Sequence, residues 1–302
     1  MVQGDSNYEL VMEGGRVKWM DSGGSYVDIT NYITKGKLCA WLDLRDNIIY
    51  KYKLDLDAMA KEFIWSVNQQ HSQGLGLEGL STVTGTYAVS NSGEALGTQD
   101  SGLDYCEKIS DGNFNLWVYD SSGAVVGGSA NVISIDSNAG GTTLSSLRND
   151  INGVGNISAS ITTDGKLMID ADSGYTFAFS DDSSNVLAAL GINTFFSGNT
   201  AGNISVNSTI VDDKNNIAAA RIDAVTGEFS SGDNDNALAM TDLQYRTMEI
   251  SQWTCNRING NTEGSVTTTI EDYYHSMVGS IGIVSSSISR DTEFNEMMVN
   301  EL

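Results

Sequence analysis

The chain has 302 residues, of which 40% are hydrophobic and 18% charged, and its 39 acidic residues outnumber 16 basic ones to give a net charge of −23. A surface this acidic repels phosphate, so nucleic acid and anionic membranes are poor partners, and no apolar run reaches the roughly 18 residues of a membrane-spanning helix. Cys39, Cys106 and Cys255 lie far apart and allow at most one disulfide, which excludes a disulfide scaffold and a cysteine-rich metal site.

The first predicted element is a β-hairpin over residues 8–20. Two short apolar segments, Tyr8–Met12 and Arg16–Met20, flank Gly14-Gly15. Two glycines at this place can supply the positive φ angles that a tight hairpin turn needs. A second turn is predicted at Ser22-Gly23-Gly24, followed by a loop to Gly36.

Between Leu38 and about Ser72 the apolar residues recur in alternate steps of four and three. This spacing predicts one long or two consecutive amphipathic helices, with Gly74 as the stop. An unbroken helix would extend ~50 Å at 1.5 Å per residue, which indicates a rod rather than part of a small compact domain. The stripe comprises Leu38, Leu42, Arg45, Ile49, Tyr52, Leu56, Met59, Phe63 and Val67.

From about Gly74 to Asn236 the helical spacing is lost. Short alternating segments separated by Gly, Asn, Asp and Ser are typical of strands joined by tight turns. The region has 20 acidic and 5 basic residues, so −15 of the net charge of −23 lies here. The predicted elements are strands at Phe114–Tyr119, Ala130–Ile135, Ile157–Thr162, Lys166–Asp170 and Tyr175–Ser180, and short helices at Leu144–Asn152 and Val186–Leu190.

Helical spacing returns after Asn236. A helix is predicted over Ala237–Arg257, then a polar break over Asn259–Gly264, then a second stripe. That stripe comprises Val266, Ile270, Tyr273, Met277, Ile281, Val284 and Ile288, and Phe294 and Met298 extend it. Separate helical segments most simply bury their stripes against each other. We therefore predict an α+β fold: a discontinuous helical bundle domain (1–73 and 237–302) with an inserted β-rich domain (74–236).

Motifs that suggest chemistry have simpler structural explanations. Gly74–Gly79 matches GxGxxG, but a dinucleotide site needs a strand before it and a helix after it, so we interpret it as a flexible domain junction. The acidic clusters Asp181-Asp182, Asp212-Asp213 and Asp233–Asp235 lack the EF-hand pattern, because position six after Asp233 is Leu238. We interpret them as solvated turn residues, and calcium bound to one such loop is the alternative.

The two histidines, His71 and His275, fall on predicted helices without zinc spacing, and are interpreted as surface or interfacial positions. Neither GxSxG nor HExxH occurs. We therefore predict no enzymatic activity, no catalytic residue, no cofactor and no metal. Gly279 and Gly282 interrupt the last predicted helix at a cost of ~1 kcal/mol each relative to alanine, which indicates close helix contact or a bend.

Three stretches together resemble the bacterial flagellar hook-associated protein 1 family, the hook–filament junction proteins. They cover the chain from about residue 36 to its end. The first comprises Gly36–Leu38, Leu44–Asp46, Val67-Asn68, His71 and Gly74. The second comprises Asn115–Asp120, Gly165–Leu167, Ser173–Phe177 and Leu187–Ser197, and the third is Tyr273–Gly282.

The resemblance implies a non-enzymatic structural adapter of the flagellum, outside the cell, exported by the flagellar type III pathway. The implied partners are the hook protein, the second hook–filament junction protein and neighbouring copies, with no nucleic acid and no membrane. The implied terminal helices are absent, so we interpret the chain as a core fragment and expect a monomer. Tyr50 stands where relatives often have proline. Candidate helix-packing or interface positions are Asn68, His71, Gly279 and Gly282.

Two alternatives are kept. One is another flagellar axial protein, either flagellin-like or the second junction protein. The other is a secreted glycan-binding or glycan-cleaving domain, which would need a cleft lined by Trp117 or Tyr119 with two convergent carboxylates.

Overall fold

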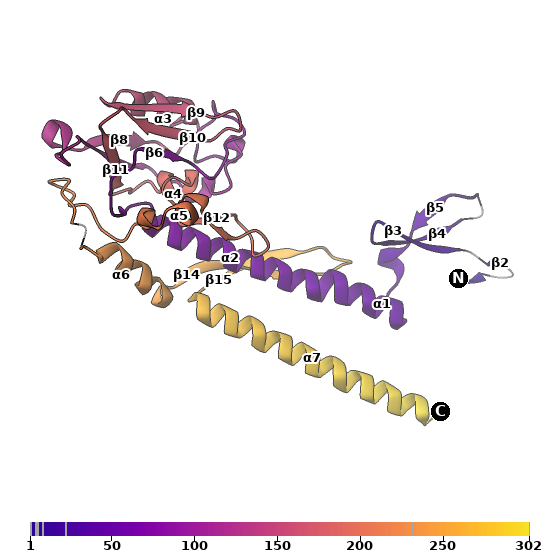
Figure 1. Ribbon diagram of the computed structural model, residues 1–302. Helices are drawn as coiled ribbons and strands as arrows, with labels where there is room; N and C mark the ends of the chain where they lie inside the picture. The colour runs from indigo at the N-terminus through magenta and orange to yellow at the C-terminus, as the bar shows by residue number, and fades with distance from the viewer. Residues whose placement is uncertain (1, 4–5, 8, 22, 231, 302) are drawn as a thin grey trace. The chain divides into compact units, whose positions relative to one another are not determined.

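The computed structural model describes residues 2–3, 6–7, 9–21, 23–230 and 232–301. It is a mixed α+β structure with long helices toward both ends of the sequence and most of the strands between them, as predicted (Figure 1). The chain divides into two compact units. Unit 1 comprises Met1–Ala58, Glu249–Thr267 and His275–Leu302, and unit 2 comprises Met59–Met248 and Thr268–Tyr274. The domain limits after residues 73 and 236 stay a prediction.

The first part of unit 1 is an antiparallel sheet in the order β3-β4-β5. Gly14 and Gly15 connect β3 to β4 with φ of +57° and +75°, angles that glycine adopts readily. The hairpin predicted over residues 8–20 is confirmed in its described part, whereas Tyr8, and Ser22 of the next turn, lie outside the described residues. The strands here are β3 (Leu10–Glu13), β4 (Arg16–Met20) and β5 (Tyr26–Asp28), preceded by the pair β1 (Val2–Gln3) and β2 (Ser6–Asn7).

The predicted long helix is confirmed as a continuous run of helical turns that ends at His71, three residues before the predicted stop at Gly74. It consists of α1 (Gly36–Asp43), the π-helical segment η2 (Leu44–Ile49) and α2 (Tyr50–His71). The Tyr52 hydroxyl lies 3.0 Å from Ser280 Oγ of the last helix, so the two long helices contact each other. Their mutual burial is incomplete, because Ile49 and Leu56 of the predicted stripe remain exposed.

Unit 2 contains antiparallel sheets in the orders β6-β10-β9 and β11-β7-β8 around an apolar core. The alternating residues of β7 place Phe114, Leu116 and Val118 in that core. The strands and short helices predicted here are confirmed within one or two residues. They are β7 (Gly112–Tyr119), β8 (Asn131–Ile135), β9 (Ile157–Ile161), β10 (Leu167–Ala171), β11 (Thr176–Ser180), α3 (Leu144–Asn152) and α4 (Val186–Leu190). Strand β6 (Thr82–Thr84) was not predicted.

Shorter elements complete the described chain. A small antiparallel pair joins β12 (Phe196–Ser197) to β13 (Ser205–Val206), and helices α5 (Ser208–Asp212) and α6 (Asp235–Asp242) follow. The 3-10 turns are η1 (Thr30–Tyr32), η3 (Gln99–Ser101), η4 (Cys106–Lys108), η5 (Val126–Gly128), η6 (Lys214–Asn216) and η7 (Leu243–Tyr245).

The helix predicted over Ala237–Arg257 is wrong. Helix α6 ends at Asp242, and β14 (Met248–Thr254) and β15 (Thr262–Thr268) form a two-stranded sheet. Strand β15 contains three threonines and a valine, which favour strands, and Ile250 of β14 is fully buried, so tertiary packing overrides the apparent helical spacing. Of the predicted polar break, residues 259–261 lie in the hairpin loop, whereas residues 262–264 and Val266 belong to strand β15.

The last helix, α7 (Ile270–Asn300), confirms the second helical stripe from Ile270 onward. Tyr273 is its buried residue, and much of its apolar surface is open to solvent. Among the described residues, none of the helices combines the length and apolar character that crossing a membrane requires.

Candidate functional site

A buried arginine holds several parts of unit 1 together. Arg257 lies in the loop between β14 and β15, and its side chain is only 4% exposed. Its guanidinium donates to the carbonyl oxygens of Thr30 and Ile33, the latter at 2.9 Å, and its Nε donates to Asp43 Oδ1 at 3.1 Å. Its backbone N–H donates to Asn47 Oδ1 at 2.6 Å. Because every contact bridges to a segment more than 200 residues away, Arg257 fastens the β14–β15 hairpin to the start of the long helix.

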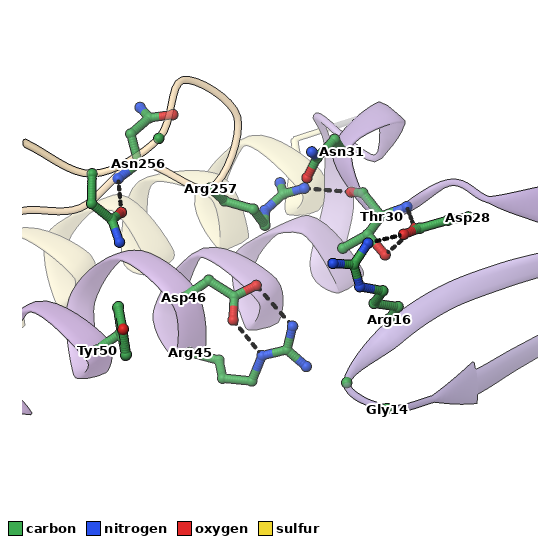
Figure 2. A pocket seen from close by; sticks show the side chains of 13 residues that line it. Gly14, Arg16, Asp28, Thr30, Asn31, Arg45, Asp46, Tyr50, Asn256 and Arg257 are labelled. Carbon is green, nitrogen blue, oxygen red and sulfur yellow. Dashed lines mark hydrogen bonds and ion pairs between the residues drawn. The ribbon is translucent and has the colours of Figure 1, made fainter. Parts of the chain in front are cut away.

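A pocket of about 600 Å³ lies beside this arginine (Figure 2). Arg45 donates to both carboxylate oxygens of Asp46, at 2.6 and 2.8 Å, and Arg16 pairs with Asp28 at 2.7 Å. Hydrogen bonds from Thr30 and the Arg16 guanidinium lower the pKa of Asp28 to about 2. A carboxyl held ionised in this way is a poor proton donor, so Asp28 offers the pocket hydrogen bonds and charge rather than acid catalysis. Its lining is Gly14, Gly15, Arg16, Asp28, Thr30, Asn31, Arg45, Asp46, Tyr50, Asn256, Arg257, Gly260 and Asn261.

Asn68 and His71 lie near the end of α2 in the interior of unit 2. The Asn68 side chain accepts from the Phe196 N–H at 2.8 Å and donates to the Phe196 carbonyl at 2.9 Å. His71 Nε2 accepts from the Ala218 N–H at 3.0 Å, so its Nδ1 carries the proton and donates to the Asn193 carbonyl at 2.8 Å. The structure thus places His71 inside the protein, not on its surface.

The environment of His71 fixes its charge as well as its orientation. The side chain is fully buried, and this burial lowers its pKa to about 4, against a smaller opposing effect of the Asn193 hydrogen bond. The imidazole is therefore neutral at pH 7. A neutral histidine whose two nitrogens are both occupied by backbone groups acts as a connector between chain segments, with neither nitrogen left to bind a substrate or a metal.

The GxGxxG segment is tightly packed, so its interpretation as a flexible junction is wrong. Leu75 and Ala220 exchange backbone hydrogen bonds, both 3.0 Å long. A Cβ on Gly76 would overlap the Asn215 carbonyl oxygen, and one on Gly79 would lie 2.5 Å from Thr176 Oγ1. The glycines are required for close approach of neighbouring chain, not for room around a phosphate.

The acidic clusters are used mainly in turns and caps. Asp182 is buried rather than solvated: its carboxylate accepts from the Ser184 N–H and hydroxyl, and from the Leu187 N–H at 2.9 Å. Burial raises the pKa of the Asp182 carboxyl. Asp233 accepts from the N–H groups of Arg221 and Asp235. Within the part of the chain that the structure describes, three or more His, Cys, Asp or Glu residues nowhere gather in a way that could hold a metal.

The aromatic residues proposed to line a glycan cleft lie in the core. Trp117 and Tyr119 are 1% and 2% exposed. The Trp117 indole donates to Ser180 Oγ at 3.0 Å, and the Tyr119 hydroxyl donates to the Gly227 carbonyl at 2.8 Å. Neither ring can stack on a sugar, so the glycan interpretation loses the residues on which it depended. Cys39, Cys106 and Cys255 are free thiols.

The remaining candidates lie on α7, where His275 is exposed. A Cβ on Gly279 or Gly282 would meet no described atom within 4 Å. The described residues therefore leave open space beside both glycines. Their role as helix-packing or interface positions stays a prediction.

Replacing Gly279 or Gly282 with alanine is expected to stabilise α7 by about 1 kcal/mol per site, because alanine fits the open space and loses less backbone entropy. Slower hydrogen exchange across α7, measured by mass spectrometry, would show it. Gly76→Ala is the matched control and should destabilise its segment. Faster exchange in the α7 variants would mean that a close contact at Gly279 or Gly282 requires the absence of a side chain there.

Sequence reasoning missed Arg257 and the hairpin that carries it. The Asn259-Gly260 pair, a frequent hairpin turn signal, was the available clue, and Gly260 has φ of +88°. The contacts of Arg257 could not be read from spacing, because they join positions distant in sequence.

Comparison with known proteins gives one family match. Residues 1–86 match the model of the flagellar hook-associated protein FlgK helical domain. This range includes the β3–β5 sheet and the whole of the long helix. No curated protein matches the chain.

Proposed function

Because the chain carries a flagellar hook-associated protein FlgK helical domain, we propose that it is a non-enzymatic structural adapter that joins the flagellar hook to the filament. The match over residues 1–86 is the observation that carries this proposal. Its partners would be the hook protein, the second junction protein and neighbouring copies, and it would reach the cell exterior by flagellar type III export.

The shape of the matched segment supports a mechanical role. The helical run from Gly36 to His71 would extend ~54 Å at 1.5 Å per residue. Asn68 and His71 are hydrogen-bonded to the backbone of unit 2, and Arg257 is bonded to the start of the long helix in unit 1. Such fixed connections suit a part that transmits torque.

The experiment is deletion of the gene in its own bacterium together with localisation of the tagged protein. Cells without it are expected to build hooks that carry no filaments and to release filament subunits into the medium. Electron microscopy with a gold-labelled antibody should place the protein at one point per flagellum, where hook meets filament. Label along the whole filament would instead assign it as a flagellin-like protein, and normal filaments in the deletion strain would refute the adapter role.

A further inference from the structure

The sequence contains two Asn-Gly pairs, Asn152-Gly153 and Asn259-Gly260, and both are exposed. An asparagine side chain reacts most readily with the backbone nitrogen of a following glycine, because glycine has no Cβ to obstruct the approach. The structure places the two pairs in different surroundings. Asn152 is the last residue of α3, whereas Asn259 lies in the loop between β14 and β15.

The first pair is held on both of its reacting groups. The Asn152 Oδ1 accepts from the Ala159 N–H at 2.7 Å, and its Nδ2 donates to the Ala159 carbonyl at 2.9 Å. The Gly153 N–H donates to the carbonyls of Asn149 and Asp150, both at 3.1 Å. The side-chain amide and the backbone nitrogen are therefore fixed in other contacts, and they can react only after this part of the chain opens.

The second pair is held much less. In the part of the chain that the structure describes, the Asn259 side chain makes no hydrogen bond. The Gly260 N–H donates to the Asn256 carbonyl at 2.8 Å, and Gly260 has φ of +88°. An exposed loop whose backbone hydrogen bonds are few opens at little cost. The Asn259 amide can thus meet the Gly260 nitrogen without first breaking contacts of its own.

We propose that Asn259 is a site of spontaneous deamidation and isoaspartate formation. The Gly260 nitrogen loses its proton to solvent and bonds to Cγ of Asn259, while the bond from Cγ to the amide nitrogen breaks and ammonia leaves. Water then opens the resulting five-membered imide. Attack of water at Cγ gives aspartate. Attack at the main-chain carbonyl carbon gives isoaspartate, in which the chain continues through Cβ and Cγ. The reaction consumes only water, and the proposal does not rest on the proposed function.

Both products alter the loop that carries Arg257. The Asn256 Oδ1 accepts from the N–H groups of Ile258 and Asn259 at 3.0 and 2.8 Å, and the Asn256 carbonyl accepts from Gly260. Isoaspartate adds one carbon to the backbone between the Asn259 and Gly260 nitrogens, so the bonds to Asn256 lose their common geometry. Arg257 lies in this turn and fastens the hairpin to the long helix. The modification is therefore expected to loosen that attachment as the protein ages.

The test follows both asparagines by mass spectrometry while the purified chain is kept in mildly alkaline buffer. Asn259 is expected to deamidate at least about tenfold faster than Asn152, because the two hydrogen bonds of Asn152 must break first. Methylation by isoaspartyl methyltransferase identifies the isoaspartate. In urea the two sites should react at similar rates, which makes Asn152 the matched control for the effect of the fold.

Two results would overturn the proposal. One is equal deamidation of Asn152 and Asn259 in the folded chain. The other is a reaction at Asn259 that is more than about tenfold slower in the folded chain than in urea, which would show that the bond from Gly260 to Asn256 protects the site.

Asn259→Gln tests the consequence for the loop. Glutamine has one more methylene and closes the corresponding six-membered ring far more slowly. After equal ageing, hydrogen exchange of residues 256–261 and 30–33 should become faster in the parent chain and stay unchanged in Asn259→Gln. Circular dichroism confirms that the variant is folded. An aged parent chain that carries isoaspartate but exchanges like fresh protein would refute the loosened attachment. None of these results depends on where the protein sits in the flagellum, so the adapter role fails or stands by the labelling experiment alone.

Discussion

Replacing Arg257 with alanine is expected to lower the free energy of unfolding of unit 1 by about 3 kcal/mol. The substitution leaves three acceptors without the guanidinium that bonds them. The Thr30 and Ile33 carbonyls lose their donor, and Asp43 loses the guanidinium 3.1 Å away. Urea unfolding, with hydrogen exchange of residues 30–43 as the local readout, measures the loss.

Arg45→Ala is the matched control for this prediction. Arg45 lines the same pocket and makes a two-point ion pair with Asp46, but its side chain is 43% exposed. An exposed pair contributes only about 0.5 kcal/mol, so this variant should remain nearly as stable as the parent chain. Arg257→Lys should lose an intermediate amount, because one ammonium group cannot reach all three acceptors. Equal losses of unfolding free energy for Arg257→Ala and Arg45→Ala would show that the burial of Arg257 adds nothing to its contribution to stability.

The elements that were predicted correctly are those whose cause is local. The turn at Gly14-Gly15 needs only two residues with positive φ, and helix α3 is bounded by Thr143, which caps its first turn. The steps of four and three from Leu38 predicted the long helix for the same reason. None of these requires knowledge of what packs against the element.

The errors arise where contacts with distant segments decide the secondary structure or the burial of a residue. Residues 248–254 have a spacing compatible with a helix, but pairing with 262–268 makes them a strand. Burial of Ile49 and Leu56 was predicted from the stripe alone, and the stripe cannot say whether a covering helix is present. The family resemblance singled out Asn68 and His71, yet their partners lie more than 100 residues away, so the hydrogen bonds had no sequence signal.

Acidification is expected to destabilise unit 2 through His71. The pKa of His71 is about 4 in the folded chain and ~6.5 when unfolded. Between these values the unfolded chain binds a proton that the folded chain excludes, so the free energy of unfolding falls as pH falls. The contribution of neutral His71 to the free energy of unfolding is fully present above about pH 6.5. About 2 kcal/mol of this contribution should be lost between pH 7 and pH 5.

A non-titrating replacement isolates this effect from the rest of the protein. His71→Asn should lower stability at pH 7, because it cannot reach both Asn193 and Ala218, and it should flatten the pH dependence between 7 and 5. His275→Asn is the matched control, since His275 is exposed on α7, and its pH profile should follow the parent chain. Carboxylates with lowered pKa values, such as Asp28, lose their contribution only at more acidic pH. A parent profile that is already flat from pH 7 to 5 would mean that His71 is protonated inside the fold, and the connection it makes to Ala218 would then have to be broken.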